Sequence, residues 1–181
     1  VGGFESHIAE ISESDWIVEA VIEQLDVKQE LLRKIEHYRP DDSIVSSNTS
    51  GIPIATISEG FGDSFRKHWL GTHFFNPPRY LPLLEVIPTA ETDPKVIQTM
   101  IEFGDRVLGK GVVVAKDTPN FIGNRIGLYG VMRVLEQLVN GNYTVEEIDA
   151  MTGPLVGRAK SATFRTLDIA GIDILTHVME N

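Results

Sequence analysis

Apolar residues along the chain form short β-branched runs that alternate with stretches of helical spacing. Residues 16–21 are rich in Ile and Val, which predicts a central parallel strand. Apolar positions near helical spacing follow this run, and Pro40-Asp41-Asp42 ends them. A helix is therefore predicted on the positions Leu25, Leu31, Leu32 and Ile35.

The same alternation continues as far as Lys116. Helices are predicted at residues 54–59, ended by Gly60, and at residues 93–107, where Asp93 is a capping residue followed by Pro94. An alternation of strands and helices is typical of a parallel-rich α/β sheet. The remaining predicted strands are residues 43–47, 69–75, 83–87 and 111–115.

The β pattern ends at Asn120, and the rest of the chain has helical spacing. Residues 122–138 predict a long, largely apolar helix, and Thr144 with Glu147 predicts a capping box for the next helix. We therefore expect a domain boundary near Asp117-Thr118-Pro119, with one part at residues 1–117 and a helical part at residues 118–181.

Composition narrows the class of protein. A net charge of −10 and a pI near 4.9 argue against a nucleic-acid surface, which needs a basic face. The absence of cysteine excludes disulfides, thiolate metal sites and cysteine nucleophiles. No apolar run has the length of a membrane span, and the N-terminus is not a signal peptide. We expect a cytoplasmic protein.

Candidate chemistry lies in two neighbouring predicted strands. His73 stands near the end of residues 69–75, and Glu85 lies in the middle of the apolar run 83–87. A charge inside such a strand is costly unless it is paired, and a carboxylate that orients an imidazole makes it a general base. The alternative is a satisfied buried histidine beside an unrelated glutamate, and spacing alone slightly favours that alternative.

Three motifs favour a functional pair. They are Ser46-Ser47-Asn48-Thr49-Ser50, Gly71-Thr72-His73-Phe74-Phe75-Asn76-Pro77 and Lys116-Asp117-Thr118-Pro119-Asn120-Phe121-Ile122-Gly123-Asn124-Arg125. Together they resemble the L-3-hydroxyacyl-CoA dehydrogenase family over essentially the full chain. The resemblance implies a truncated Rossmann-type sheet, the C-terminal part of an NAD-binding domain, followed by the start of an all-α substrate and dimerisation domain. It also implies NAD-dependent oxidation of an acyl-CoA thioester in fatty acid β-oxidation.

The resemblance implies roles for four residues in catalysis. His73 would be the general base, Glu85 would hold its ring, and Ser50 and Asn124 would fix the substrate oxygen. Two of these residues have local alternatives. Ser50 suits a cap of the helix predicted at residues 54–59, and Asn124 suits a hydrogen bond to a helical neighbour.

Candidate cofactor contacts follow from the same resemblance. Glu23 and Lys28 match positions at the nicotinamide ribose, and an ordinary solvated helix face is an equally weighted alternative. Asn48 and Ser50 are further candidates near the path of the cofactor. No metal-ligand spacing appears, and no role is assigned to His7, His37, His68 and His177.

Two departures from the family pattern stand out. No G-x-G-x-x-G occurs, so we expect a piece of a longer protein that alone binds NAD weakly and is inactive. Residues 157–168 replace a Gly-Pro-Phe-Glu-Leu type turn, although Gly171-Ile172-Asp173 fits. This variant resembles the branch fused to an enoyl-CoA hydratase.

Other family functions stay open at this point. They are action on 3-hydroxybutyryl-CoA or a sugar acid, and a non-catalytic, crystallin-like role. The helical part carries more apolar residues than one helix packing hides, so we expect a homodimer or packing against a missing module.

Overall fold

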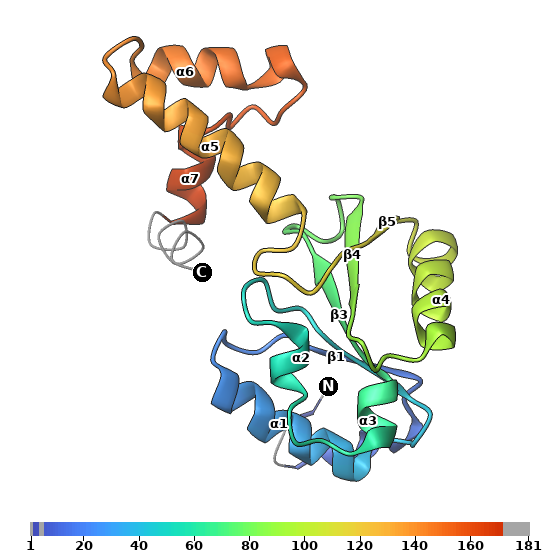
Figure 1. Ribbon diagram of the computed structural model, residues 1–181. Coiled ribbons are helices and arrows are strands. Elements are labelled where there is room, and N and C mark those ends of the chain that lie inside the picture. The colour runs from blue at the N-terminus through green and yellow to red at the C-terminus, as the bar shows by residue number, and fades with distance from the viewer. Residues whose placement is uncertain (1, 4–5, 172–181) are drawn as a thin grey trace. The chain divides into compact units, whose positions relative to one another are not determined.

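A five-stranded sheet organises the first part of the chain (Figure 1). The computed structural model describes residues 2–3 and 6–171. The strand order is β1-β2-β3-β4-β5, and every neighbouring pair is parallel except β3 with β4. The expected parallel-rich α/β sheet is thereby confirmed. The strands are β1 (Trp16–Glu19), β2 (Ile44–Ser47), β3 (Trp69–Phe74), β4 (Leu83–Pro88) and β5 (Gly111–Val114).

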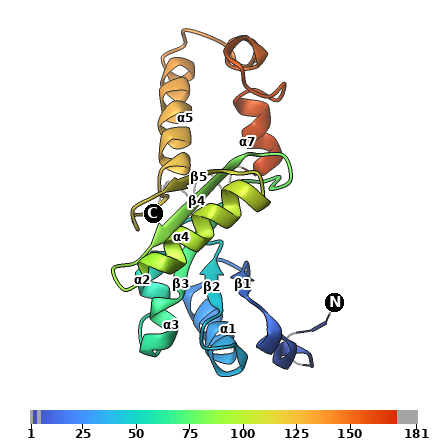
Figure 2. The same cartoon turned by 90° about the vertical axis from the view of Figure 1, so that its right-hand side faces the viewer.

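Helices cover both faces of this sheet (Figure 2). Successive strand residues face opposite sides, so Trp69 and Ile87 join one core cluster while Leu70 and Val86 join another. The first cluster packs under three helices, α1 (Leu25–Tyr38), α2 (Ile54–Ile57) and α3 (Asp63–Lys67). The second packs under α4 (Pro94–Glu102). Short 3-10 turns also occur, η1 (Ile8–Glu13) and η3 (Pro154–Val156).

The first strand has the predicted parallel pairing. Within the described residues, β1 pairs with β2 alone, and its central position in a larger sheet stays a prediction. The strand also stops at Glu19, because the amide of Val21 donates to the Glu19 carboxylate at 2.6 Å instead of to a neighbouring strand.

The helix that begins at Asp93-Pro94 has the predicted start and an unexpected end. The Asp93 carboxylate accepts the amide of Lys95 at 2.7 Å, as its capping position predicts. The regular α-helix ends at Glu102, and a π-helical turn, η2 (Phe103–Val107), follows. Gly104 is required here, because a Cβ atom would come within 2.7 Å of Val112. The short helix α3 was not predicted.

A second compact unit follows the sheet. The chain divides into Val1–Phe121 and Ile122–Asn181, a few residues after the expected boundary at Asp117. Phe121 belongs with the first unit because it is 2% exposed and packs into the core under α1 and α2. The second unit contains α5 (Gly123–Val139), α6 (Val145–Thr152) and α7 (Phe164–Ala170).

Two sets of side-chain to backbone hydrogen bonds stabilise the second unit. The predicted capping box is confirmed, since the Thr144 hydroxyl accepts the amide of Glu147 and the Glu147 carboxylate accepts the amide of Thr144. The Asp149 carboxylate accepts three backbone amides at the start of α7, those of Thr163, Phe164 and Arg165. Ile172, Asp173 and His177 lie outside the described residues. No helix in the described ranges is long and apolar enough to cross a bilayer.

Candidate active site

The antiparallel pairing of β3 with β4 brings an imidazole and a carboxylate together. His73 is the register partner of Glu85, and paired residues point to the same face. The His73 Nδ1 atom lies 2.7 Å from the Glu85 Oε2 atom. Both residues are buried, at 4% and 0% exposure, so the pairing offsets the cost of burying the carboxylate. The alternative of two unrelated residues is wrong.

The Glu85 carboxylate determines which ring nitrogen of His73 carries the proton and which is an acceptor. A carboxylate only accepts hydrogen bonds, so the proton of the neutral ring sits on Nδ1. The opposite nitrogen, Nε2, lies 3.2 Å from the Ser50 hydroxyl oxygen and can accept a hydrogen bond from this hydroxyl. Glu85, His73 and Ser50 therefore form one hydrogen-bonded line.

Two aromatic rings flank this imidazole. The ring centroids of Phe75 and Phe121 lie 4.6 and 5.5 Å from that of His73, and both rings are tilted against it. Phe121 is reached through two successive residues with positive φ, 62° at Asn120 and 44° at Phe121, which non-glycine residues rarely adopt. These rings shield the imidazole from water on two sides.

Ser50 lies in the loop between β2 and α2, and this loop is held by a carboxylate from another segment. The Glu23 Oε1 atom accepts the Thr49 hydroxyl at 2.5 Å and the backbone amides of Ser50 and Gly51, both at 3.0 Å. Glu23 itself lies between β1 and α1. The loop conformation therefore depends on a residue far away in sequence.

The alternative that Ser50 caps α2 is wrong. The position before α2 is Pro53, and no side chain of the preceding loop caps the helix. The amides of Ile54 and Ala55 donate instead to the carboxylate of Asp117, both at 2.8 Å. The Ser50 hydroxyl is thereby left to its contact with His73.

Lys28 is buried, although the sequence also allowed a solvated helix face. Its side chain is 1% exposed, and its ammonium lies 2.9 Å from the Glu19 carboxylate and 3.2 Å from that of Glu23. The Val21 carbonyl accepts from it at 3.3 Å. The solvated-face interpretation is therefore wrong for Lys28. These three charged residues are called the Glu19–Lys28–Glu23 cluster below.

Sequence reasoning overlooked Glu19, although a signal was present. Glu19 ends a β-branched run, and a charge at such a position needs a partner for the same reason as Glu85. The structure gives it three donors: the ammonium of Lys28, the hydroxyl of Ser47 at 2.5 Å and the amide of Val21.

The remaining predicted residues lie in separate places. The Asn48 side-chain oxygen accepts the amide of Phe74 at 2.9 Å and so fastens the end of β3. Asn124 lies half-buried in the first turn of α5, in the second unit. Contacts of Asn48 and Ser50 with a cofactor, and of Asn124 with a substrate, stay predictions.

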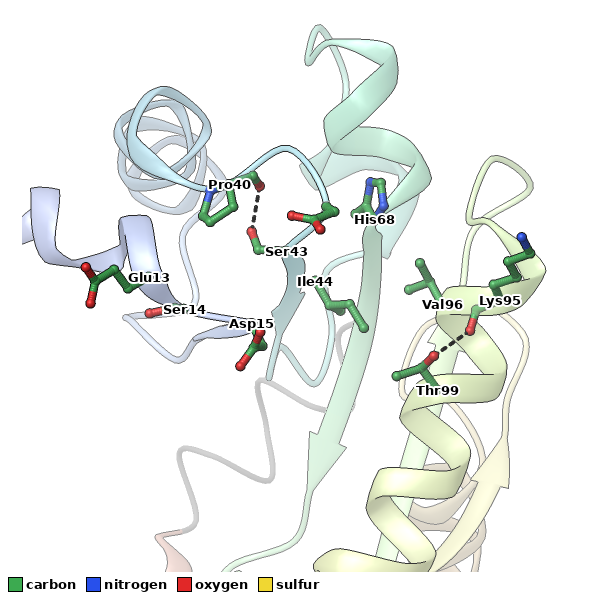
Figure 3. Close-up of a pocket in the computed structure, with 11 residues that line it drawn as sticks. Glu13, Ser14, Asp15, Pro40, Ser43, Ile44, His68, Lys95, Val96 and Thr99 are labelled. Atoms are coloured by element: carbon green, nitrogen blue, oxygen red, sulfur yellow. Dashed lines mark hydrogen bonds between the residues drawn. The ribbon is translucent and has the colours of Figure 1, made fainter.

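A separate hollow lies at the amino-terminal ends of β1, β2 and β3 (Figure 3). It has a volume of about 480 Å³, and Asp15, Ile44 and His68 stand at or just before the starts of β1, β2 and β3. The His68 Nδ1 atom contacts the carbonyl of Ser64, not a carboxylate. The hollow therefore has no paired imidazole comparable to His73. Across residues 2–3 and 6–171, no three His, Asp or Glu side chains form a group that could hold a metal ion.

Glu23 gives the protein a pH-dependent contribution to stability. Burial alone would raise its pKa, but the hydrogen bonds from Thr49, Gly51 and Ser50 and the charge of Lys28 bring the pKa below the usual 4.5. A depressed pKa in the folded state means that the stabilisation is fully present above pH 4.5 and is lost as the pH falls through the folded pKa. Glu19 is the other ionisable group that faces Lys28.

We expect the free energy of unfolding of Glu23→Gln to be lower than that of the wild type near neutral pH, and the difference to shrink under acid. Urea unfolding measured between neutral pH and pH values below 4.5 checks this. Glu30→Gln is the control, since Glu30 is an exposed carboxylate on α1. A difference for Glu23→Gln that stays constant on acidification would contradict the assignment.

Comparison with known proteins adds family information to this geometry. Residues 2–118 match the family model described as "3-hydroxyacyl-CoA dehydrogenase, NAD binding domain", and residues 121–181 match its "C-terminal domain". A relative from Bacillus subtilis, named "Probable 3-hydroxyacyl-CoA dehydrogenase", is 54% identical over 180 residues. That alignment covers 99% of this chain and 23% of the relative.

Two further similarities agree with the first. A Deinococcus radiodurans protein of the same name is 49% identical over 178 residues, which cover 98% of this chain and 51% of that protein. The crystal structure of (S)-3-hydroxybutyryl-CoA dehydrogenase PaaH1 from Ralstonia eutropha superposes with a TM-score of 0.84 at 28% identity. The superposition covers 96% of this chain and 60% of that one. The chain thus spans between 23% and 60% of the length of these three proteins.

Proposed function

The chain belongs to the 3-hydroxyacyl-CoA dehydrogenase family, and from this premise we propose that the whole protein oxidises L-3-hydroxyacyl-CoA to 3-ketoacyl-CoA with NAD in fatty acid β-oxidation. The observation that carries the proposal is the line Glu85–His73–Ser50, with contacts of 2.7 and 3.2 Å. Such a line suits removal of a proton from a substrate hydroxyl.

We assign the following roles in this reaction to residues of the chain. The Nε2 atom of His73 accepts the proton of the substrate hydroxyl, and the Glu85 carboxylate stabilises the imidazolium that results. The hydroxyl of Ser50, already beside Nε2, orients the same substrate oxygen. The bound nicotinamide supplies the hydride acceptor.

The described residues fit the nicotinamide end of the cofactor. In open α/β sheets, ligands bind outside the carboxyl ends of the parallel strands. Val18 and Ile22, at and just after the end of β1, are 41% and 61% exposed and suit a flat apolar ring. Glu23 follows Ile22 in the chain, the buried ammonium of Lys28 lies 3.2 Å from the Glu23 carboxylate, and Asn48 and Ser50 follow the end of β2. These 181 residues offer no glycine-rich phosphate turn, so they would hold the nicotinamide half alone.

Substrate length has a specific alternative. The likeness to the Ralstonia eutropha enzyme named for (S)-3-hydroxybutyryl-CoA favours a short acyl chain. A non-catalytic role is disfavoured, because a purely structural protein does not require an imidazole held between a carboxylate and a hydroxyl.

The second unit supports a proposal about assembly. Exposed apolar side chains occur along α5, including Ile126 at 68%, Tyr129 at 70% and Val139 at 82%. An apolar surface of this kind is usually covered by protein. We propose that the helical unit packs against a second copy or against another module of the same cytoplasmic protein.

The test uses the full-length protein with a panel of substrates. We expect NADH-dependent reduction of acetoacetyl-CoA, and comparison with longer 3-ketoacyl thioesters gives the chain-length preference. Free 3-keto acids and sugar acids are the controls, and we expect no turnover with them. Activity confined to the free acids would overturn the proposed thioester substrate.

A further inference from the structure

We infer that Glu23 is a positioning residue that fixes the loop carrying Ser50 and so presents the Ser50 hydroxyl to His73. The inference deepens the proposed function and rests on it for its catalytic consequence. It assigns Glu23 a task within the protein itself, separate from any contact with the nicotinamide.

The contacts of Glu23 converge on one short stretch. A single oxygen, Oε1, accepts from three successive residues: the hydroxyl of Thr49 and the backbone amides of Ser50 and Gly51. Charge-assisted hydrogen bonds of this kind are stronger than neutral ones. The backbone on both sides of the Ser50 side chain is therefore tied to one carboxylate.

The Glu23 carboxylate is itself held in place by a buried lysine. The Glu23 side chain is 41% exposed, and exposed ion pairs hold their geometry poorly. Here the second oxygen, Oε2, lies 3.2 Å from the ammonium of Lys28, which is 1% exposed. Lys28 in turn is fixed by the fully buried carboxylate of Glu19 at 2.9 Å. The Glu19–Lys28–Glu23 cluster thus connects the buried end of β1 to the loop.

The other hydrogen bonds of the loop hold residues on either side of Ser50. The amide of Asn48 donates to the Glu19 carbonyl at 2.8 Å, and the Asn48 side-chain oxygen accepts the amide of Phe74 at 2.9 Å. The Ser47 hydroxyl accepts the amide of Thr49 at 3.1 Å, and the Thr49 hydroxyl accepts the amide of Ile52 at 3.2 Å. None of these contacts involves the backbone of Ser50. Loss of the Glu23 carboxylate would therefore release the backbone of Ser50, and a displacement of about 1 Å near a reacting group costs up to ~10²-fold in rate.

A double-mutant cycle in the full-length protein tests this task. We expect Glu23→Ala to lower kcat for acetoacetyl-CoA reduction about ten- to a hundredfold. In a Ser50→Ala background the same substitution should cost far less, because the hydroxyl that Glu23 positions is already missing. Glu23→Gln retains a side-chain oxygen for the loop amides and should retain more of kcat than Glu23→Ala.

The alternative, a direct contact of Glu23 with the cofactor, gives a different pattern. Under this alternative, Glu23→Ala raises the KM for NADH and leaves kcat unchanged. The KM rises by the same factor in the wild-type and Ser50→Ala backgrounds. That pattern would overturn the inference. A loss of kcat that is equal in both backgrounds would also overturn it.

Amide hydrogen exchange gives a readout that does not depend on catalysis. We expect the amides of Ser50 and Gly51 to exchange faster in Glu23→Ala than in the wild type, while Glu30→Ala leaves their exchange unchanged. Unchanged exchange in Glu23→Ala would refute the positioning task. Faster exchange in a protein that lacks thioester activity would leave the loop assignment standing and reject the proposed function alone.

Discussion

Replacing His73 with glutamine is expected to lower kcat of the full-length protein by about 10²–10⁴-fold, the typical contribution of a positioned general base. Glutamine fills a similar volume and forms hydrogen bonds, but its amide cannot take up the proton of the substrate hydroxyl. The Nε2 atom is the group lost at the position that faces Ser50, 3.2 Å away in the wild type. Steady-state kinetics with acetoacetyl-CoA and NADH measures the effect, and thermal unfolding confirms that the variant is folded.

The matched control is His37→Gln. His37 is exposed on α1 and stacks edge-on against Tyr38 with ring centroids 4.7 Å apart, away from the Glu85–His73–Ser50 line. We expect wild-type kcat for this variant. Wild-type kcat in His73→Gln would remove His73 from the reaction, and the proposed function would lose its chemical basis.

Replacing Lys28 with methionine is expected to lower the free energy of unfolding by about 3–5 kcal/mol, the usual cost of breaking a buried ion pair from one side. Methionine fills the space of the lysine side chain but leaves the carboxylate of Glu19, which is 0% exposed, without its cation. Urea unfolding of the wild type and the variant gives the difference.

Two comparisons separate this effect from a general loss of packing. Adding Glu19→Gln to Lys28→Met should cost less than Glu19→Gln alone, because the uncompensated charge is then removed. Lys34→Met is the control on the same helix, since Lys34 pairs with Glu30 across 3.5 Å at an exposed site and such pairs contribute little. Equal losses for Lys28→Met and Lys34→Met would contradict the prediction.

The elements governed by short-range patterns could be predicted from the sequence. The capping box at Thr144 and the start of α4 at Asp93 depend on contacts within three residues, and both were predicted. Helix α3 was missed, because its five residues are too few to show a period. The order of the strands depends on which strands pair, and no local pattern reports that.

The candidate site divides in the same way. A charge within an apolar strand indicated that Glu85 needs a partner, but spacing alone slightly favoured two unrelated residues, and the family resemblance led to the prediction of the pair with His73. The same argument applied to Glu19 would have predicted its pairing with a cation. Ser50 was ambiguous because its local sequence suits a helix cap, and the group that caps α2 instead is Asp117, 63 positions from Ile54.

The carboxylate of Asp117 connects its own segment to a loop that is distant in sequence. Its two oxygens satisfy the first two amides of α2, directly after the loop of Ser50. During divergence of homologous sequences, an exchange at position 117 for a residue without paired oxygens would strand those amides and loosen the rear attachment of that loop. Substitutions at Asp117 are therefore expected to displace the loop that carries the Ser50 hydroxyl.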